Sequence, residues 1–159
     1  MGGFPSIRHN EVRDVTASLL TEICHNVSVE PHLQPLSGEL LSLRTANSTD
    51  NARLDIACDG FWGGRFERAF FDIRVFNPCA QSNKSSSLTA TYRRHELEKR
   101  RSYDQRIREV EHGTFTPLVF STTGGMGKAA TVFYKRLASL LSDKLDEDTT
   151  LLSIGFGAV

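Results

Sequence analysis

Hydrophobic residues recur at helical spacing in three stretches of the chain, which are residues 10–24, 89–112 and 128–144. In the first, Val12, Val15, Leu19 and Ile23 fall on one stripe of a helix, and Asn10 is a plausible N-cap. The second carries a sparse apolar stripe on a strongly charged background, and the third is amphipathic. The pattern therefore predicts three helices, one of them rich in charge.

Four further runs have the apolar character expected of strands, and they are residues 27–36, 52–58, 68–76 and 115–121. Pro31 and Pro35 interrupt the first run, which favours a bent strand at the edge of a sheet. The second and third runs are joined by "DGFWGGRFE", whose glycines suit a hairpin with a longer loop. We therefore expect three consecutive strands followed by a separate fourth.

The predicted order of elements is helix, three strands, helix, strand, helix. This order indicates an α/β (α+β) protein, an αβββαβα three-layer sandwich with a central mixed sheet. With 159 residues, 39% of them hydrophobic and 24% charged, the chain is expected to form one domain over residues 1–145. Residues 146–159 show no helical period and are predicted to be an added strand or a loose tail.

Charge and cysteine content limit the function classes. The 19 basic and 19 acidic residues balance, so a nucleic-acid partner would have to be held by a local patch. The three cysteines show no metal-ligand spacing and are expected to be buried free thiols in a reducing compartment. No apolar run approaches the roughly 18 residues of a membrane-spanning helix, and no signal peptide is visible. We expect a nuclear or cytoplasmic protein with no membrane partner.

The stretch "AFFDIRVFNP" places two charges, Asp72 and Arg74, in a run that otherwise predicts a buried strand. Side chains alternate along a strand, so both charges share one face, and Asp55 of the neighbouring strand can meet Asp72 there. Burying a charge costs several kcal/mol unless a partner or a metal offsets it. Two explanations stay open: a closed network of ion pairs that includes Arg53, or a metal site.

A metal site for phosphodiester cleavage needs two or three hard oxygen ligands. Asp55 and Asp72 meet this need, and Glu11 on the first predicted helix supplies a third carboxylate at the margin of its apolar face. The cofactor would be Mg²⁺ or Mn²⁺. Arg74 would lie beside the metal and the phosphate.

The order of these residues resembles the PD-(D/E)XK nucleases, which have the restriction-endonuclease-like fold. That family has an acidic residue on a first helix, an Asp on the second strand and Asp-x-Lys or Glu-x-Lys on the third, where this chain has Glu11, Asp55 and "DIR" at 72–74. The resemblance implies that these residues and Arg74 are catalytic. Arg74 departs from the usual Lys, and because Arg stays charged it can neutralise a phosphate but cannot readily act as a base.

Longer stretches, among them "GGFPSIRHNEVRD", "FFDIRVFNP" and "YDQRIREVEHGTFTPLVFSTTGGMGK", resemble an uncharacterised domain downstream of reverse transcriptases in animal mobile-element proteins. This resemblance covers roughly residues 2–144. It implies that the chain is a fragment or derivative of a larger transposon-encoded polyprotein. In that setting, a nuclease would nick DNA to prime insertion of the element.

Cations on the charged helix form a candidate nucleic-acid surface. A phosphate-facing stripe would contain Arg93, Lys99, Arg100 and Arg106, and Lys128 after the glycine-rich turn "TTGGMG" could join it. A solvated helix with i,i+4 ion pairs explains the same pattern. The turn also suggests a phosphate loop, but Lys128 is followed by Ala129 instead of the hydroxyl residue that such loops use for magnesium.

Three functions therefore remain. The first is a metal-dependent endonuclease-like domain of a mobile element that cleaves DNA. The second is a catalytically decayed nucleic-acid- or protein-binding module of the same fold. The third is a nucleotide-binding switch built on the glycine-rich turn.

Overall fold

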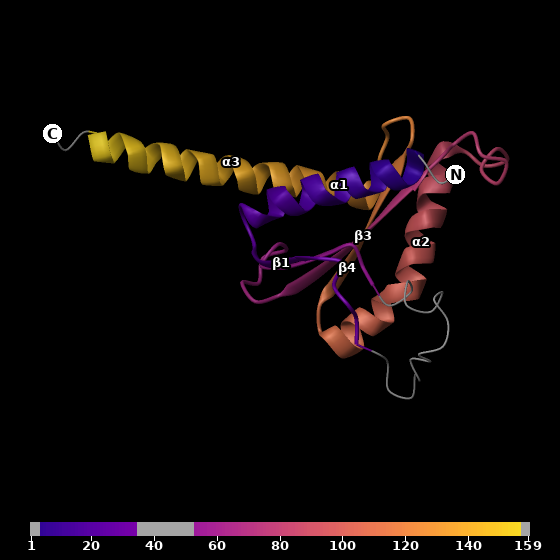
Figure 1. Cartoon of the computed structure of the whole chain (residues 1–159), viewed down its shortest axis with the longest axis horizontal. Coiled ribbons are helices and arrows are strands. Elements are labelled where there is room, and N and C mark those ends of the chain that lie inside the picture. Colours follow the sequence, from indigo (N-terminus) through magenta and orange to yellow (C-terminus); the bar gives the residue numbers. More distant parts are fainter. Residues whose placement is uncertain (1–3, 35–52, 157–159) are drawn as a thin grey trace.

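A computed structural model describes residues 4–34 and 53–156 of the chain (Figure 1). Its elements are α1 (Phe4–Thr21), β1 (His25–Val29), β2 (Ile56–Asp59), β3 (Arg68–Phe76), α2 (Leu88–Arg106), the π-helical turn η2 (Ile107–Glu111), β4 (Thr114–Ser121) and α3 (Lys128–Phe156). The predicted α/β composition and the predicted order of elements are confirmed.

The four strands form one mixed sheet in the order β1-β2-β3-β4. The pairs β1–β2 and β2–β3 are antiparallel, with Ala57 opposite Phe70 in the second pair. The pair β3–β4 is parallel, because the chain crosses from one strand to the next through α2. In this pair Asp72 lies opposite Pro117. β3 is thus a central strand with a neighbour on both sides.

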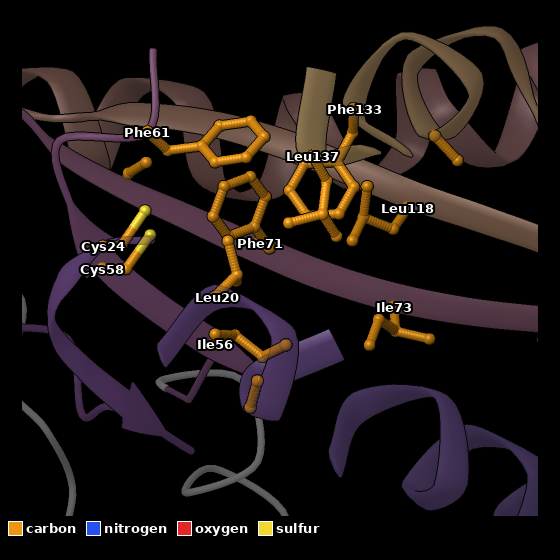
Figure 2. Packing of buried hydrophobic residues seen from close by; sticks show 13 residues of the cluster. Leu20, Cys24, Ile56, Cys58, Phe61, Phe71, Ile73, Leu118, Phe133 and Leu137 are labelled. Carbon is orange, nitrogen blue, oxygen red and sulfur yellow. The ribbon is translucent and has the colours of Figure 1, made fainter. Parts of the chain in front are cut away.

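Two helices cover one face of the sheet, α1 and α3, which lie alongside each other in Figure 1. The core between these helices and the sheet contains Leu20, Phe71 and Phe133, all of which are completely buried (Figure 2). Aromatic rings fill its centre, with ring centroids of Phe71 and Phe133 4.7 Å apart and those of Phe61 and Phe133 at the same separation. This apolar layer holds β3 rigidly from one side.

The helix α2 and the turn η2 cover the opposite face. Tyr103 and Ile107 pack there against Ala57, Phe70 and Phe115. Because helices cover both faces, the side chains of residues 69–73 of β3 are buried on either face, and this explains why Asp72 is only 5% exposed.

The outer edge of β4 is covered by the chain itself. After β4 the chain turns back, so that Gly127 N–H donates to the carbonyl of Val119 at 2.8 Å and Ser121 N–H to that of Gly125 at 2.9 Å. Earlier in the strand, Pro117 has no N–H that could donate to an added strand. An edge protected in this way resists pairing with another strand.

Several boundaries differ from the sequence prediction. The first strand is His25–Val29, where 27–36 was predicted, and positions 35 and 36 lie outside the described residues. The second strand is Ile56–Asp59, where 52–58 was predicted. Helix α1 begins at Phe4, so Asn10 lies inside the helix and the predicted N-cap is wrong. Helix α3 continues to Phe156, where a strand or a loose tail was predicted. Its extension exposes Leu145, Leu151 and Leu152, so these apolar residues do not form the periodic buried stripe that predicts a helix. Extending an existing helix avoids the cost of nucleation, which explains why the extension is helical.

None of the described helices could cross a membrane. α3 has 29 residues, but neither it nor another described helix combines the length and the apolar character that a membrane span requires.

The three cysteines are free thiols. Cys24 and Cys58 are buried in the core beneath α1 and α3, where Figure 2 shows their sulfur atoms side by side. A hydrogen bond between them lowers the pKa of Cys24, and the same bond together with burial raises that of Cys58. Cys79 is exposed, so the expectation that all three are buried is wrong for this residue.

Candidate active site

Asp55 and Asp72 lie close to the end of the β2–β3 pairing. The register ends with Ile56 opposite Phe71, and Asp55, just before β2, donates its N–H to the carbonyl of Phe71 at 3.2 Å, next to Asp72 in the chain. Both carboxylates line one polar cleft of about 280 Å³. The structure therefore brings these two predicted residues together, on the face of the sheet that α2 covers.

Two contacts fix the Asp55 carboxylate. Its Oδ2 accepts a hydrogen bond from the backbone N–H of Ile73 at 2.6 Å and another from Nε2 of His9 at 3.1 Å. The Ile73 N–H belongs to β3 and the His9 ring to α1, so two rigid elements orient the same oxygen. Both of these hydrogen bonds go to Oδ2, so Oδ1 is the oxygen that would bind a ligand in the cleft.

Asp72 is the most buried charged group of this cleft. Lys99 reaches it from α2 and places Nζ 2.5 Å from Oδ2, as an ion pair without the angles of a regular hydrogen bond. Burial and, to a smaller extent, the nearby charge of Asp55 raise the pKa of Asp72 to about 6, although Lys99 acts to lower it. The folded protein therefore resists ionising Asp72.

This raised pKa predicts a pH dependence of stability. In the unfolded chain an Asp has a pKa of about 3.9. Between pH 4 and pH 6 the folded state keeps a proton that the unfolded state releases, so the free energy of unfolding falls as pH rises through this window. The expected loss without divalent metal is on the order of 2 kcal/mol, measured by urea denaturation at pH 4 and pH 7.

Asp72→Asn is the matched comparison, because Asn does not titrate. Its free energy of unfolding relative to the native protein is expected to rise by the same amount between pH 4 and pH 7. Any constant penalty for leaving Lys99 unpaired cancels in this comparison. Parallel pH profiles for the two proteins would show that Asp72 ionises as an ordinary surface carboxyl.

His9 is a member of the site that the sequence did not reveal. It lines the cleft with both aspartates, and its hydrogen bond to Asp55 raises its pKa. His9 lies seven residues before Thr16 and eleven before Leu20, which places it on the buried stripe of α1. Because the predicted helix began at Asn10, His9 lay outside it, and its position on the buried stripe was not recognised from the sequence.

The structure does not bring Glu11 to the two aspartates. Two residues from His9, it projects from another side of α1. There it is exposed and borders a separate, mostly apolar cleft of about 380 Å³ with Val15 and Phe120. Within the described residues, no group of three or more His, Cys, Asp and Glu side chains is arranged to hold a metal ion.

Arg74 shares the face of Asp72 but does not line the cleft. It is exposed and lies near His95, whose pKa is lowered by burial and by the charge of Arg74. Lys99 instead places a cation at Asp72. Arg74 of the same strand was the predicted neighbour of Asp72, and the structure has Lys99 of α2 there.

The residues present fit a single magnesium ion. Mg²⁺ is commonly held by one or two carboxylates together with substrate phosphates and water, and it does not need a complete protein cage. Asp55 and Asp72 would supply the two carboxylates. Asp72 Oδ2 already has a cation beside it, the Lys99 ammonium, so this buried oxygen lies where a positive charge is stabilised.

The predicted cationic stripe does not form one surface. Lys99 points to Asp72. Arg93 and Lys128 border one cleft beside the glycine-rich turn, and Arg100 and Lys128 border another. Arg106 is partly buried at the end of α2, where its charge acts on Tyr103.

The glycine-rich turn is not an open phosphate loop. Oε1 of Glu96 accepts a hydrogen bond from the N–H of Ala129 at 3.0 Å, in the first turn of α3. A Cβ on Gly127 would lie 2.5 Å from the same oxygen, so glycine allows this carboxylate to approach. The anion position at the helix N-terminus is therefore filled by Glu96, which weighs against the nucleotide-binding switch.

Comparisons of the chain with protein-family models, with curated proteins and with solved structures gave no match.

Proposed function

We propose that this chain is a metal-dependent endonuclease-like domain of the restriction-endonuclease-like fold, and that it cleaves DNA phosphodiester bonds for a mobile element. The observation that carries the proposal is the convergence of Asp55, Asp72 and Lys99 on one polar cleft. The mixed sheet with parallel β3 and β4, flanked by α1 and α2, agrees with the fold that the motif resemblance implies.

The cleft residues would divide the chemistry among them. Asp55 and Asp72 would hold Mg²⁺, which when bound polarises a phosphate and lowers the pKa of a water molecule. His9 and the Ile73 N–H keep Asp55 in one orientation. Such fixed ligands are needed because small displacements of reacting groups are costly.

Lys99 would act on the scissile phosphate. In the free protein its ammonium neutralises Asp72, and when a cation binds the two aspartates this charge becomes available to another anion. An ammonium beside the phosphate stabilises the negative charge that develops during cleavage. This role belongs to Lys99 because Arg74 lies outside the cleft.

The alternative is a decayed nucleic-acid- or protein-binding module. The ion pair of Lys99 with Asp72 and the Arg at position 74 both agree with it, because a protein without a metal also needs to neutralise a buried carboxylate. The two functions differ in their response to a chelator. Binding by a decayed module persists in EDTA, and no condition restores cleavage.

Conversion of supercoiled plasmid to the nicked form tests the proposal. The protein is expected to nick plasmid in Mg²⁺ or Mn²⁺ and to stop when EDTA is added. A sample carrying both Asp55→Asn and Asp72→Asn controls for contaminating nuclease. Absence of nicking in either metal at high protein concentration would refute the enzyme and leave the decayed module.

A further inference from the structure

A second cleft, of about 330 Å³, lies at the outer edge of β4. Trp62 from the β2–β3 loop forms one wall, and α2 and the start of α3 form the others. Thr116 lies on the strand side, and Val132 adds an apolar surface. The cleft is therefore partly aromatic and partly polar, with a volume at the lower end of the range for small-ligand sites.

Contacts with Phe61 and Arg136 hold the Trp62 ring in place. It is half-buried and packs edge-to-face on Phe61, with ring centroids 4.7 Å apart. The guanidinium of Arg136 lies 5.9 Å from its centroid and donates to the carbonyl of Phe61 at 2.6 Å. A rigid, partly open aromatic ring loses little entropy when a flat group stacks on it.

Two cations border the same cleft. Arg100 has a side chain that is 41% exposed, and its Nη1 lies 3.5 Å from the carbonyl of Phe115 and 3.8 Å from Oδ1 of Asp104, in an exposed i,i+4 ion pair that a phosphate can replace. Lys128 is exposed at the start of α3, and within the described residues it makes no ion pair. The one acid in the lining, Glu96, is engaged by the N–H of Ala129. The cleft thus offers positive charge beside an aromatic ring.

The strand edge argues against a peptide in this cleft. Addition of a strand to β4 would need a row of outward N–H and C=O groups. Arg100 already contacts the outward carbonyl of Phe115, and Pro117 has no N–H. The occupant must therefore be recognised by side chains.

We propose that this cleft binds an unpaired base of a nucleic-acid strand, with Trp62 as the stacking platform and Arg100 and Lys128 on the adjoining phosphates. Base stacking on an aromatic ring inside a cationic groove is the general mode of single-strand binding. Lys99 and Arg100 are neighbours on α2, one in the aspartate cleft and the other here. A strand crossing α2 would reach both clefts. The inference rests on the proposed function for the class of substrate.

Trp62 is the only tryptophan of the chain, so its fluorescence reports on this cleft alone. Titration with oligothymidylate in EDTA is expected to quench the emission. Duplex DNA of the same length and polyphosphate are expected to quench much less, because neither presents an unpaired base. Equal quenching by polyphosphate would overturn base stacking, and equal quenching by duplex would overturn the preference for unpaired bases.

Three variants separate the roles of ring and charge. Trp62→Leu is expected to weaken binding of labelled oligothymidylate, measured by anisotropy, roughly 5- to 100-fold, whereas Trp62→Phe keeps most of it. Lys128→Gln keeps the fluorophore and is expected to shift the quenching curve to higher oligonucleotide concentration. Lys135→Gln, an exposed cation further along α3, is the matched control.

Thermal melting shows whether Trp62→Leu is folded, and if it is not, Lys128→Gln and Trp62→Phe decide the outcome. Binding without quenching, or an unchanged curve for Lys128→Gln, would overturn the inference. Because these titrations contain no metal, they are independent of cleavage. Quenching in a protein that never nicks plasmid would refute the enzyme but keep the cleft, and nicking without quenching would do the reverse.

Discussion

Replacing Asp72 by Asn is expected to lower Mg²⁺-dependent nicking of plasmid by at least about 10³-fold, a loss of roughly 4 kcal/mol of transition-state stabilisation. Asn has nearly the same shape but carries no charge, so the cleft would lose half of its anionic ligands for magnesium. Asp55→Asn is expected to have an effect of the same order. Initial rates at several Mg²⁺ concentrations measure both.

The matched control is Asp143→Asn, which removes an exposed carboxylate of α3 far along the chain from both aspartates. It is expected to nick plasmid at the native rate. Melting curves must show that all three variants are folded, since Asp72→Asn leaves Lys99 without its carboxylate partner. If folded Asp72→Asn nicks as fast as the native protein, the catalytic role of the cleft is wrong.

Lys99→Gln is expected to lower the same rate by about 10²-fold, the scale reported for removing one group that stabilises developing charge. Arg74→Gln is expected to stay within about threefold of the native rate, because this side chain does not line the cleft. Both substitutions remove one positive charge and keep a polar side chain, so each controls for the other. Nicking rates at saturating Mg²⁺ separate them.

The opposite result would be equally informative. A large loss of nicking rate for Arg74→Gln, with little change for Lys99→Gln, would show that Arg74 acts on the phosphate, as the motif resemblance implies. It would also mean that the contact between Lys99 and Asp72 only neutralises a buried charge. Lys99→Arg adds a further test, since it keeps the charge but changes the geometry of the donor.

The strand β3 could be predicted to the residue, and the reason is local. Its run of apolar residues over 68–76 is bounded by a glycine-rich loop and by Asn77-Pro78, which cannot continue a central strand. The two ends of α3 differ in whether the sequence predicts them. Its start at Lys128 follows a glycine turn and was predicted correctly, but its end at Phe156 depends on helix propagation through an exposed segment that no periodic pattern marks.

The meeting of Asp55 and Asp72 in one cleft was expected from sequence, because the alternation of side chains along neighbouring strands is a local property. The partners of the two aspartates were not, since they come from helices packed on the sheet by long-range contacts. Lys99 nevertheless lies four residues before Tyr103 and eight before Ile107, both buried. Its place on that stripe was a signal that it faces the sheet.

The central claim is that Asp55 and Asp72 hold a divalent cation together. Anomalous scattering from a crystal grown with Mn²⁺ measures this directly, because it locates the metal without relying on activity. The expected result is a peak within about 2.0–2.2 Å of one carboxylate oxygen from each aspartate, and its loss in Asp72→Asn crystals. A crystal with manganese elsewhere, and with Lys99 still paired to Asp72, would contradict the metal site.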